Sequence, residues 1–297
     1  MASNSQYNLL AVGALLLSST MWGVLWYPMR IFELQGLSGL WSSLIMFFAA
    51  GLVALPWMFS NYRSLSGQWP MILGLMLVSG WANIAFILAV IDGNVVRVLL
   101  LFFLSPLWTV ILGRIFLKER LGFLGVITLF IAMLGAVFML WRPELGLSMI
   151  NSSSDFYALT AGMAFAVSNV IVRKMHILPA MAKAAAVWWG VVFLALLWLV
   201  ALDIEMPTVS SNWVFLQASM LGLFGMVVMT LAVQYGVTRM PVSRSAVILL
   251  FELVAGAVSA QLLANEQVLP QEWFGGGLIL IAGYLAARRE EKGSIDV

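Results

Sequence analysis

The sequence has no cysteine and a single histidine, His176, among its 297 residues. Disulfide bonds, thiol nucleophiles and thiolate metal sites are therefore excluded. One histidine without clustered partners is more typical of a solvated loop than of a metal site. We accordingly expect no metal site, no catalytic residue and no cofactor.

Charged residues are also scarce, at 9% of the chain, whereas 63% are hydrophobic and the mean hydropathy is +1.02. Soluble domains are only about 45–50% apolar. Apolar runs of about 20 residues, each long enough to cross roughly 30 Å of hydrocarbon, recur from end to end. The runs are continuous rather than alternating, which excludes a β-barrel. The composition thus predicts an all-α integral membrane protein.

Turn residues and charges divide the chain into ten apolar segments, which we expect to be transmembrane helices. The amino-terminal "MASNSQY" lacks the basic region and the cleavage site of a signal peptide, so the first segment should remain as a helix. The ten segments are 8–28, 38–58, 70–91, 95–114, 122–140, 155–173, 184–203, 213–235, 242–263 and 272–288.

Lysine and arginine are distributed unevenly around these segments. If the amino terminus is cytoplasmic, only Arg30, Arg97 and Arg142 lie outside, and Arg244 lies inside the start of helix nine. The positive-inside rule then places both termini in the cytoplasm. The net charge of +2 reflects this topology, so we infer no nucleic-acid partner. The eleven inner residues are Arg63, Arg114, Lys118, Arg120, Arg173, Lys174, Lys183, Arg239, Arg288, Arg289 and Lys292.

The chain resembles itself across its two halves, 1–148 and 149–297. Since each half holds five helices, an odd number, the second half should be inverted in the bilayer relative to the first. Chance alignment of two apolar helices is the alternative, and matched charges in so uncharged a chain weigh against it. A displacement of 147 residues pairs Arg97 with Arg244, Ser105 with Glu252 and Glu119 with Glu266; one of 143 pairs Trp22 with Phe165 and Arg30 with Arg173.

Three stretches carry a family resemblance: "MWGVLWYPMR" in helix one, "GNVVRVLLLFFLSPLWTVILGRIFLKERLGFLGVITLFIAMLGAVFM" across helices four and five, and "MPVSRSAVILLFELVAGAVSAQLLANEQVLPQEWFGGGLILIAG" across helices nine and ten. They resemble the drug/metabolite transporter superfamily, specifically its ten-helix bacterial exporters built from two EamA-type repeats. The resemblance implies a bacterial inner-membrane protein. It also implies that helices one to four and six to nine surround a central cavity, with helices five and ten flanking it. In the second repeat Leu253 occupies the position that Pro106 has in the first, so helices four and nine need not bend alike.

Glu252 lies at the midpoint of helix nine, roughly 15 Å from either end at 1.5 Å per residue. This depth is too great for its side chain to reach water along the helix, so the carboxyl should face the bundle interior. Ser245, Leu249, Gly256 and Ser259 share its stripe of the helix, which favours a cavity over lipid. A buried hydrogen-bonding group between helices is the structural alternative.

Other candidates for the same cavity combine aromatic faces with a few polar groups. Such a lining suits an amphipathic small molecule, for example an amino acid or a drug-like compound. For any single aromatic, ordinary helix packing remains the alternative. The candidates are Trp22, Trp26, Asn83, Ser105, Trp108, Gln234 and Tyr235.

Two arginines are candidate gates. Arg97 would close the outer mouth by pairing with Asp92, and Arg244 would act at the inner mouth. Anchoring to headgroup phosphates is the alternative for both. We interpret Glu119 and Glu266 as structural, ordering the short connection to the next helix.

These features together predict a secondary transporter, and specifically an exporter of small amphipathic metabolites that works by alternating access. A phosphate-binding motif for nucleotide hydrolysis is absent, and we do not expect an enzyme, which would need a His/Asp/Glu cluster at one depth. The driving force has two possible sources. Protonation of Glu252 could couple export to a proton gradient, or the solute could move by facilitated diffusion. An importer or antiporter of phosphorylated metabolites is a second alternative, and it would need two or more bases in the cavity. A third alternative is a pore or a lipid flippase. The protein should be a monomer or a homodimer in the lipid bilayer.

Overall fold

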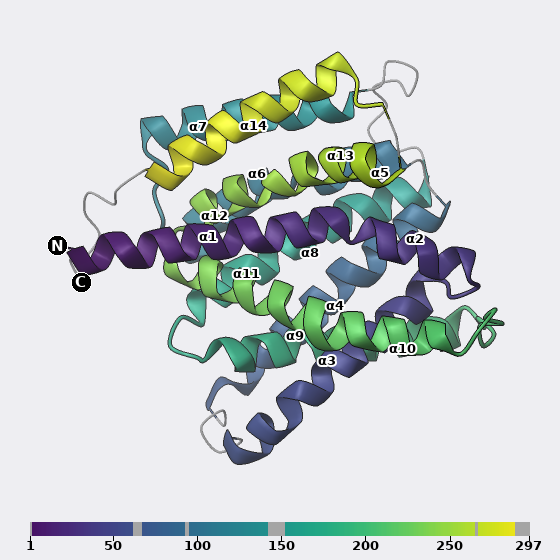
Figure 1. Ribbon diagram of the computed structural model, residues 1–297. Helices are drawn as coiled ribbons and strands as arrows, with labels where there is room; N and C mark the ends of the chain where they lie inside the picture. The colour runs from purple at the N-terminus through teal and green to yellow at the C-terminus, as the bar shows by residue number, and fades with distance from the viewer. Residues whose placement is uncertain (1, 62–66, 93–94, 142–151, 265–266, 289–297) are drawn as a thin grey trace.

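The computed structural model describes residues 2–61, 67–92, 95–141, 152–264 and 267–288. These residues form a bundle of α-helices with one short π-helical segment, η3 (Figure 1). In chain order the elements are α1 (Ala2–Val24), α2 (Trp26–Leu34), α3 (Gly39–Asn61), α4 (Trp69–Asp92), α5 (Val95–Phe102), α6 (Ser105–Phe116), α7 (Phe123–Leu140), α8 (Ser153–Lys174), α9 (Ala180–Ala201), α10 (Trp213–Met220), η3 (Leu221–Met226), α11 (Val227–Arg239), α12 (Val242–Leu249), α13 (Phe251–Ala264) and α14 (Pro270–Arg288).

Nine segments of the described chain are long and apolar enough to cross a bilayer. Four of them consist of consecutive helices: α1 with α2, α5 with α6, α10 with η3 and α11, and α12 with α13. The tenth predicted segment forms α14, which begins on a polar turn that contains Glu272 and falls outside these nine. The all-α, multi-pass fold predicted from the composition is confirmed.

Helices from the two halves of the chain pack against each other rather than forming two separate bodies. α1 lies against α11 and α13, and α4 lies against α8 and α9. α7 and α14 pair along one edge of the bundle, as Figure 1 shows. This edge pairing agrees with the flanking position that the resemblance implies for helices five and ten.

Small residues allow the helices to approach closely at the middle of the bundle. A methyl group on Gly190 of α9 would collide with the main chain of Met76 in α4, and one on Gly80 of α4 would collide with the carbonyl oxygen of Gly190. Glycine at both positions therefore permits main chain to contact main chain, as is common between transmembrane helices.

The outer surface of the bundle is apolar. On α7, for example, Phe123, Leu124 and Phe130 are exposed by 81%, 67% and 63%. Exposed apolar area on this scale is stable only in contact with lipid or another apolar surface. The outer surface of the bundle therefore faces the lipid of the bilayer rather than water.

The fourth span is broken between α5 and α6, at Phe103 and Leu104. The Leu104 N–H donates to the Leu101 carbonyl at 3.4 Å, and the Leu107 N–H donates to the Leu104 carbonyl at 3.0 Å, so this turn is tightened by i to i+3 bonds. Pro106 occupies the first turn of α6, where its missing N–H leaves no bond unmade. The predicted helix 95–114 is therefore two helices that meet within the membrane.

The ninth span is broken at Leu250, 147 residues after Phe103, although no proline marks the place. The Leu250 N–H donates to Val247 at 3.2 Å and the Leu253 N–H donates to Leu250 at 3.1 Å, which again tightens the turn. The absence of a proline at Leu253 left open whether the two helices bend alike, and both spans are interrupted at equivalent positions. Glu252 consequently lies in the first turn of α13 rather than in the interior of a continuous helix.

Candidate functional site

A cavity of about 1420 Å³ lies where six helix ends meet. They are the final turns of α6, α8 and α11 and the first turns of α7, α9 and α12. The predicted topology places all six on the cytoplasmic side, so we name this space the inner cavity. Its volume is sufficient for a small metabolite, since ligand pockets commonly measure about 300–1,000 Å³.

The wall of the inner cavity is strongly basic. Glu119 is the one carboxylate among the described residues that line it, and His176 is exposed in the turn after α8. A mainly aromatic and acidic lining was expected at mid-membrane. This cavity differs because it lies at the end of the bundle where the bases that we predict to be cytoplasmic gather. The bases on its wall are Lys118, Arg120, Arg173, Lys174, Lys183, Arg239 and Arg244.

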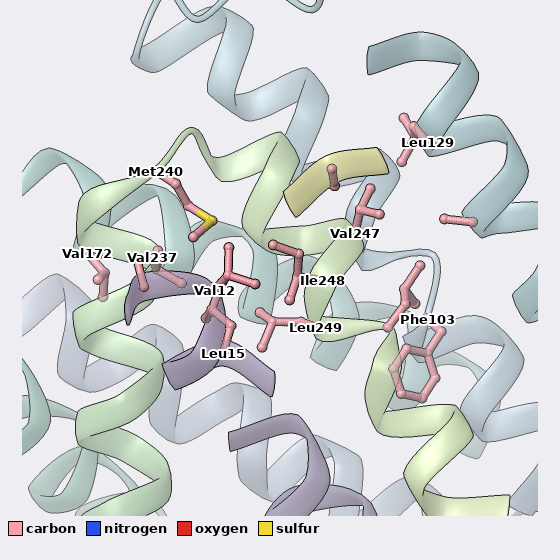
Figure 2. Close-up of a cluster of buried hydrophobic side chains, with 14 of the residues drawn as sticks. Val12, Leu15, Phe103, Leu129, Val172, Val237, Met240, Val247, Ile248 and Leu249 are labelled. Carbon is pink, nitrogen blue, oxygen red and sulfur yellow. The ribbon is translucent and has the colours of Figure 1, made fainter. Parts of the chain in front are cut away.

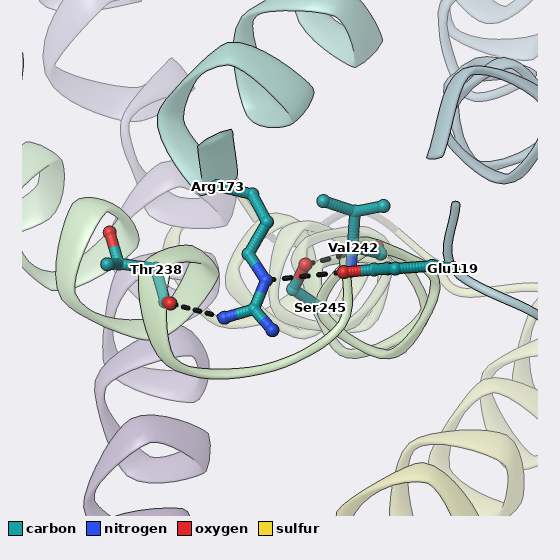
Figure 3. Close-up of polar contacts among 5 residues, drawn as sticks. All are labelled: Glu119, Arg173, Thr238, Val242 and Ser245. Carbon is teal, nitrogen blue, oxygen red and sulfur yellow. Dashed lines mark hydrogen bonds and ion pairs between the residues drawn. The ribbon is translucent and has the colours of Figure 1, made fainter. Parts of the chain in front are cut away.

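Glu119 joins three segments at the edge of this cavity (Figure 3). One carboxylate oxygen accepts from Arg173 Nε, at the end of α8, at 3.2 Å. The other accepts from the main-chain N–H of Val242, the first residue of α12, at 2.9 Å. Arg173 Nη1 also donates to the Thr238 carbonyl oxygen, near the end of α11.

The bond from Glu119 to α12 was not predicted. We expected Glu119 to order the connection to the next helix, which stays a prediction, and its carboxylate reaches the beginning of α12, more than 120 residues later in the chain. The first N–H groups of a helix have no partner within the helix, and a carboxylate satisfies them well. The equivalent prediction for Glu266 lies outside the described residues.

Lys183 is the most deeply buried charge of the cavity wall, with 1% of its surface exposed. Its ammonium group donates to the Thr238 hydroxyl at 2.5 Å, and that hydroxyl donates to the Gln234 main-chain carbonyl. The Gln234 side chain is 3% exposed, and its oxygen has no hydrogen-bond partner among the described residues. Lysine, threonine and glutamine thus form a polar floor for the inner cavity.

Tyr235 and Arg244, two of the predicted site residues, border this floor. The Arg239 guanidinium lies 3.6 Å from the centre of the Tyr235 ring, a cation–π contact. Arg244 is only 6% exposed, and its Nη2 donates to the carbonyl oxygen of Ala287 in α14. Arg244 therefore points into the protein, where it ties α12 to the end of α14, rather than reaching toward lipid headgroups.

Glu252 does not line the inner cavity. Along the ninth span, Val247, Ile248 and Leu249 separate it from Arg244, and these three belong to a buried apolar cluster (Figure 2). Glu252 itself is half-buried, and its carboxyl group makes no hydrogen bond or ion pair with any residue that the structure describes. The other labelled members of the cluster are Val12, Leu15, Phe103, Leu129, Val172, Val237 and Met240.

The first-half candidates are buried near the break in the fourth span. Ser105, the first residue of α6, is 4% exposed, and its main-chain carbonyl accepts from the Thr109 hydroxyl at 2.8 Å. The Trp108 indole N–H is buried and has no partner among the described residues. Asn83 is half-buried on α4. None of these lines the inner cavity.

Trp22 and Trp26 lie at the junction of α1 and α2. Trp26 Nε1 donates to the Ser259 hydroxyl on α13 at 2.8 Å, and that hydroxyl shares its proton between the carbonyl oxygens of Gly256, at 2.8 Å, and Gly23, at 3.1 Å. Trp22 is half-buried against a second apolar cluster. Trp26 and Ser259 therefore join the first and ninth spans, a packing role that the sequence left open.

The backbone of Asp92 ends α4, and Arg97 lies in α5. Their side chains lie outside the described residues, so the outer gate stays a prediction.

The sequence was compared with known protein families. It matches the EamA-like transporter family over residues 9–141 and again over 152–288. The chain belongs to the EamA-like transporter family. This EamA-like chain is therefore a membrane transporter of the drug/metabolite transporter superfamily, as its motifs predicted.

Two further comparisons bear on the fold. A protein of known crystal structure superposes with a TM-score of 0.74 over 97% of the EamA-like chain and 99% of its own, at 18% sequence identity. At that identity the likeness shows the fold alone. No curated protein matched the sequence.

The residues that sequence reasoning missed are Lys183, Thr238 and Arg173. Lys183 and Arg173 appeared in the count of cytoplasmic charges but were not considered as cavity groups. A usable signal existed, because both lie within apolar segments or at their ends rather than in long polar loops.

Proposed function

We propose that this EamA-like protein is a secondary transporter that exports small amphipathic metabolites by alternating access. The observation that carries the proposal is the inner cavity of about 1420 Å³ at the end of the bundle where the lysines and arginines gather. Because that end is cytoplasmic by the positive-inside rule, a solute from inside the cell would load there. The exporter operates without nucleotide hydrolysis.

The apolar cluster of Figure 2 forms the barrier in this mechanism. It lies between the inner cavity and Glu252 along the ninth span, so a solute passes only when these side chains separate. The breaks at Phe103 and Leu250 are positions where the two halves of a span can tilt independently. The two family matches and the equivalent places of the breaks support two repeats, 1–148 and 149–297, with the second inverted.

Glu252 is the coupling group in this proposal. A carboxyl that lies within the membrane and forms no bond with the described residues is available to a proton or a substrate. The absence of such bonds weighs against the alternative of a hydrogen-bonding link between helices.

The experiment begins with metabolite profiles of cells and medium, with and without overexpression. A metabolite that accumulates in the medium is then loaded into proteoliposomes under an imposed pH gradient. Glu252→Gln should retain solute exchange at zero gradient but lose acceleration by the gradient. Glu33→Gln, an exposed carboxylate on α2, is the control and should behave as wild type. Flux that ignores the gradient in the wild type would instead establish facilitated diffusion.

An importer or antiporter is the second candidate, and the basic wall favours it. A phosphorylated solute needs two or more bases, and the wall of the inner cavity provides seven. Reconstituted protein oriented by its labelled terminus would separate the two: an exporter moves solute out of the compartment that its inner cavity faces. Flux that fails to saturate with concentration would favour a pore over either.

A further inference from the structure

We propose that the floor of the inner cavity is an anion site centred on Lys183, and that the transported solute carries a carboxylate or phosphate group. This inference rests on the proposed transport function and specifies the chemical class of its substrate. It concerns residues that face the cytoplasmic end of the bundle, a site separate from Glu252.

The hydrogen bonds of Lys183 leave room for a ligand. An ammonium group has three donors, and Lys183 uses one of them on the Thr238 hydroxyl. With 1% of its surface exposed, it has no ion-pair partner in the described part of the chain. Buried charges in proteins are normally paired, because leaving one unpaired is costly. The two remaining donors are therefore available to an anion.

Gln234 adds an uncharged partner at the same floor. Its side chain is buried, lines the cavity, and makes no hydrogen bond with any described residue. Its amide nitrogen provides two donors, a set that suits carboxylate or phosphate oxygens. The Thr238 hydroxyl is already committed in both directions and serves to hold the ammonium in place.

The surrounding charges favour the same sign of ligand. Glu119 is the one carboxylate on the described wall, and it is occupied by Arg173 and by the Val242 N–H. Lys174 and Arg239 are exposed at the rim, where their charge would attract an anion toward the floor. A solute anion and a lipid headgroup phosphate share this chemistry, and the experiment must separate them.

Binding is measured on the full-length protein in nanodiscs of phosphatidylcholine, which carry no net charge. The probes are benzoate, benzamide and benzylammonium, which share a ring and differ in charge, together with inorganic phosphate. The proposal expects saturable binding of benzoate or phosphate and none of the neutral and cationic probes. Lys183→Met should weaken that binding by about tenfold or more, the usual effect of removing a charged hydrogen bond.

Three variants make the result specific to the floor. Arg114→Met removes an exposed positive charge from α6 that does not line the cavity, and it should change affinity by no more than about twofold. Lys183→Arg keeps the charge and should retain binding. If Lys183→Met does not fold, Thr238→Val removes only the hydroxyl that holds the ammonium, and it should weaken binding by about threefold or more.

Equal affinities for wild type and the Lys183 or Thr238 variant would overturn the proposal, as would equal binding of benzoate and benzylammonium. Competition by phosphatidylglycerol in the nanodisc, without competition by soluble glycerol phosphate, would assign the site to lipid and overturn the substrate assignment. Proteoliposomes that exchange neutral metabolites while benzoate fails to bind would overturn the anion site and leave the transporter intact. Proteoliposomes that exchange nothing would reject the proposed function itself.

Discussion

Glu119 holds together parts of the chain that are far apart in sequence. Its two oxygens bind Arg173 and the first N–H group of α12, while Arg173 reaches the Thr238 carbonyl. The carboxylate therefore couples the ends of three spans at the mouth of the inner cavity. Both ionic side chains are partly exposed, at 27% and 21%, so their attraction is weakened by water, and the bond to the helix end should matter more.

Replacing Glu119 tests whether its bond to the beginning of α12 contributes more to stability than its ion pair with Arg173. Glu119→Ala removes both interactions and should lower the free energy of unfolding by about 1–2 kcal/mol. Glu119→Gln keeps an oxygen for the Val242 N–H and should recover at least half of that loss. Melting curves of the purified protein in detergent measure the difference, with Glu33→Ala on α2 as an exposed control. Identical losses for Ala and Gln would assign the stability to the ion pair instead.

The contact between Trp26 and Ser259 gives a second prediction at this scale. Ser259→Ala leaves the indole N–H without its partner at 2.8 Å, and an unsatisfied buried donor costs about 1–3 kcal/mol. Trp26→Phe removes the donor as well, so the double variant should be less destabilised than the sum of the two single variants. Melting curves of the four proteins form a double-mutant cycle, and strict additivity would contradict the coupling.

Individual functional residues were only partly predictable from sequence. Glu252 could be placed at mid-membrane because its depth follows from counting along an apolar segment. The hydrogen-bond partners of Glu119 and Lys183 could not be predicted from the sequence. They come from segments more than 50 residues away, and the contacts depend on how the helices assemble. Apolar segments predict where helices cross the bilayer, not which faces meet.

At the scale of elements, the approach of α1 to α13 depends on Gly23. A methyl group there would collide with the Glu252 carbonyl oxygen and with the side chain of Ala255. Main chain therefore lies against main chain beside the break in the ninth span. Any movement of α13 relative to α1 starts from this contact.

Gly23→Ala should therefore push the two helices apart. We expect a loss of about 1–3 kcal/mol in unfolding free energy, as for other overpacked interiors, and slower solute exchange. Gly13→Ala on the same helix is the matched control, because nothing lies within 4 Å of its added methyl group. Its stability should stay unchanged or rise slightly, since alanine favours helix. A Gly23→Ala protein with the same melting temperature as the wild type would show that α13 accommodates the methyl group without strain.

The helices themselves were the most predictable elements. The segment predicted at 155–173 is α8 (Ser153–Lys174), because length and apolar content leave a transmembrane segment few alternatives. The interruptions were not predicted. Leu250 lies in the apolar run 246–251, which ends at Glu252, and no proline marks the break. Pro106 did mark the other break, but proline also occurs inside α3, at Pro56, without ending that helix.

At the scale of the whole molecule, the positive charge of the inner cavity comes from residues that also determine the predicted topology. Seven bases lie on one cavity wall, and the positive-inside rule predicts that this end of the bundle is cytoplasmic. The predicted topology and the proposed attraction of an anion therefore depend on the same side chains. The arrangement of the termini remains a prediction, which the absence of cysteine makes easy to test.

Any introduced cysteine would be the only thiol in the protein. His176→Cys, exposed beside the inner cavity, should react with a membrane-impermeant maleimide only after permeabilisation. Asn212→Cys, exposed just before α10 on the predicted outer side, should react in intact cells. Gel shifts of the labelled protein measure both. The reverse pattern would place the inner cavity outside the cell.

The interleaving of the two halves also bears on how the protein is made. The Ser259 hydroxyl binds the Gly23 carbonyl across 236 residues, so α1 enters the membrane long before its partner on α13 exists. At about 5–20 residues per second of synthesis, the delay is roughly 10–50 s. During that interval the polar groups of α1 must be shielded by lipid headgroups, by the insertion machinery or by a transient neighbour. Ribosome pausing and chaperone supply should therefore influence the yield of this protein.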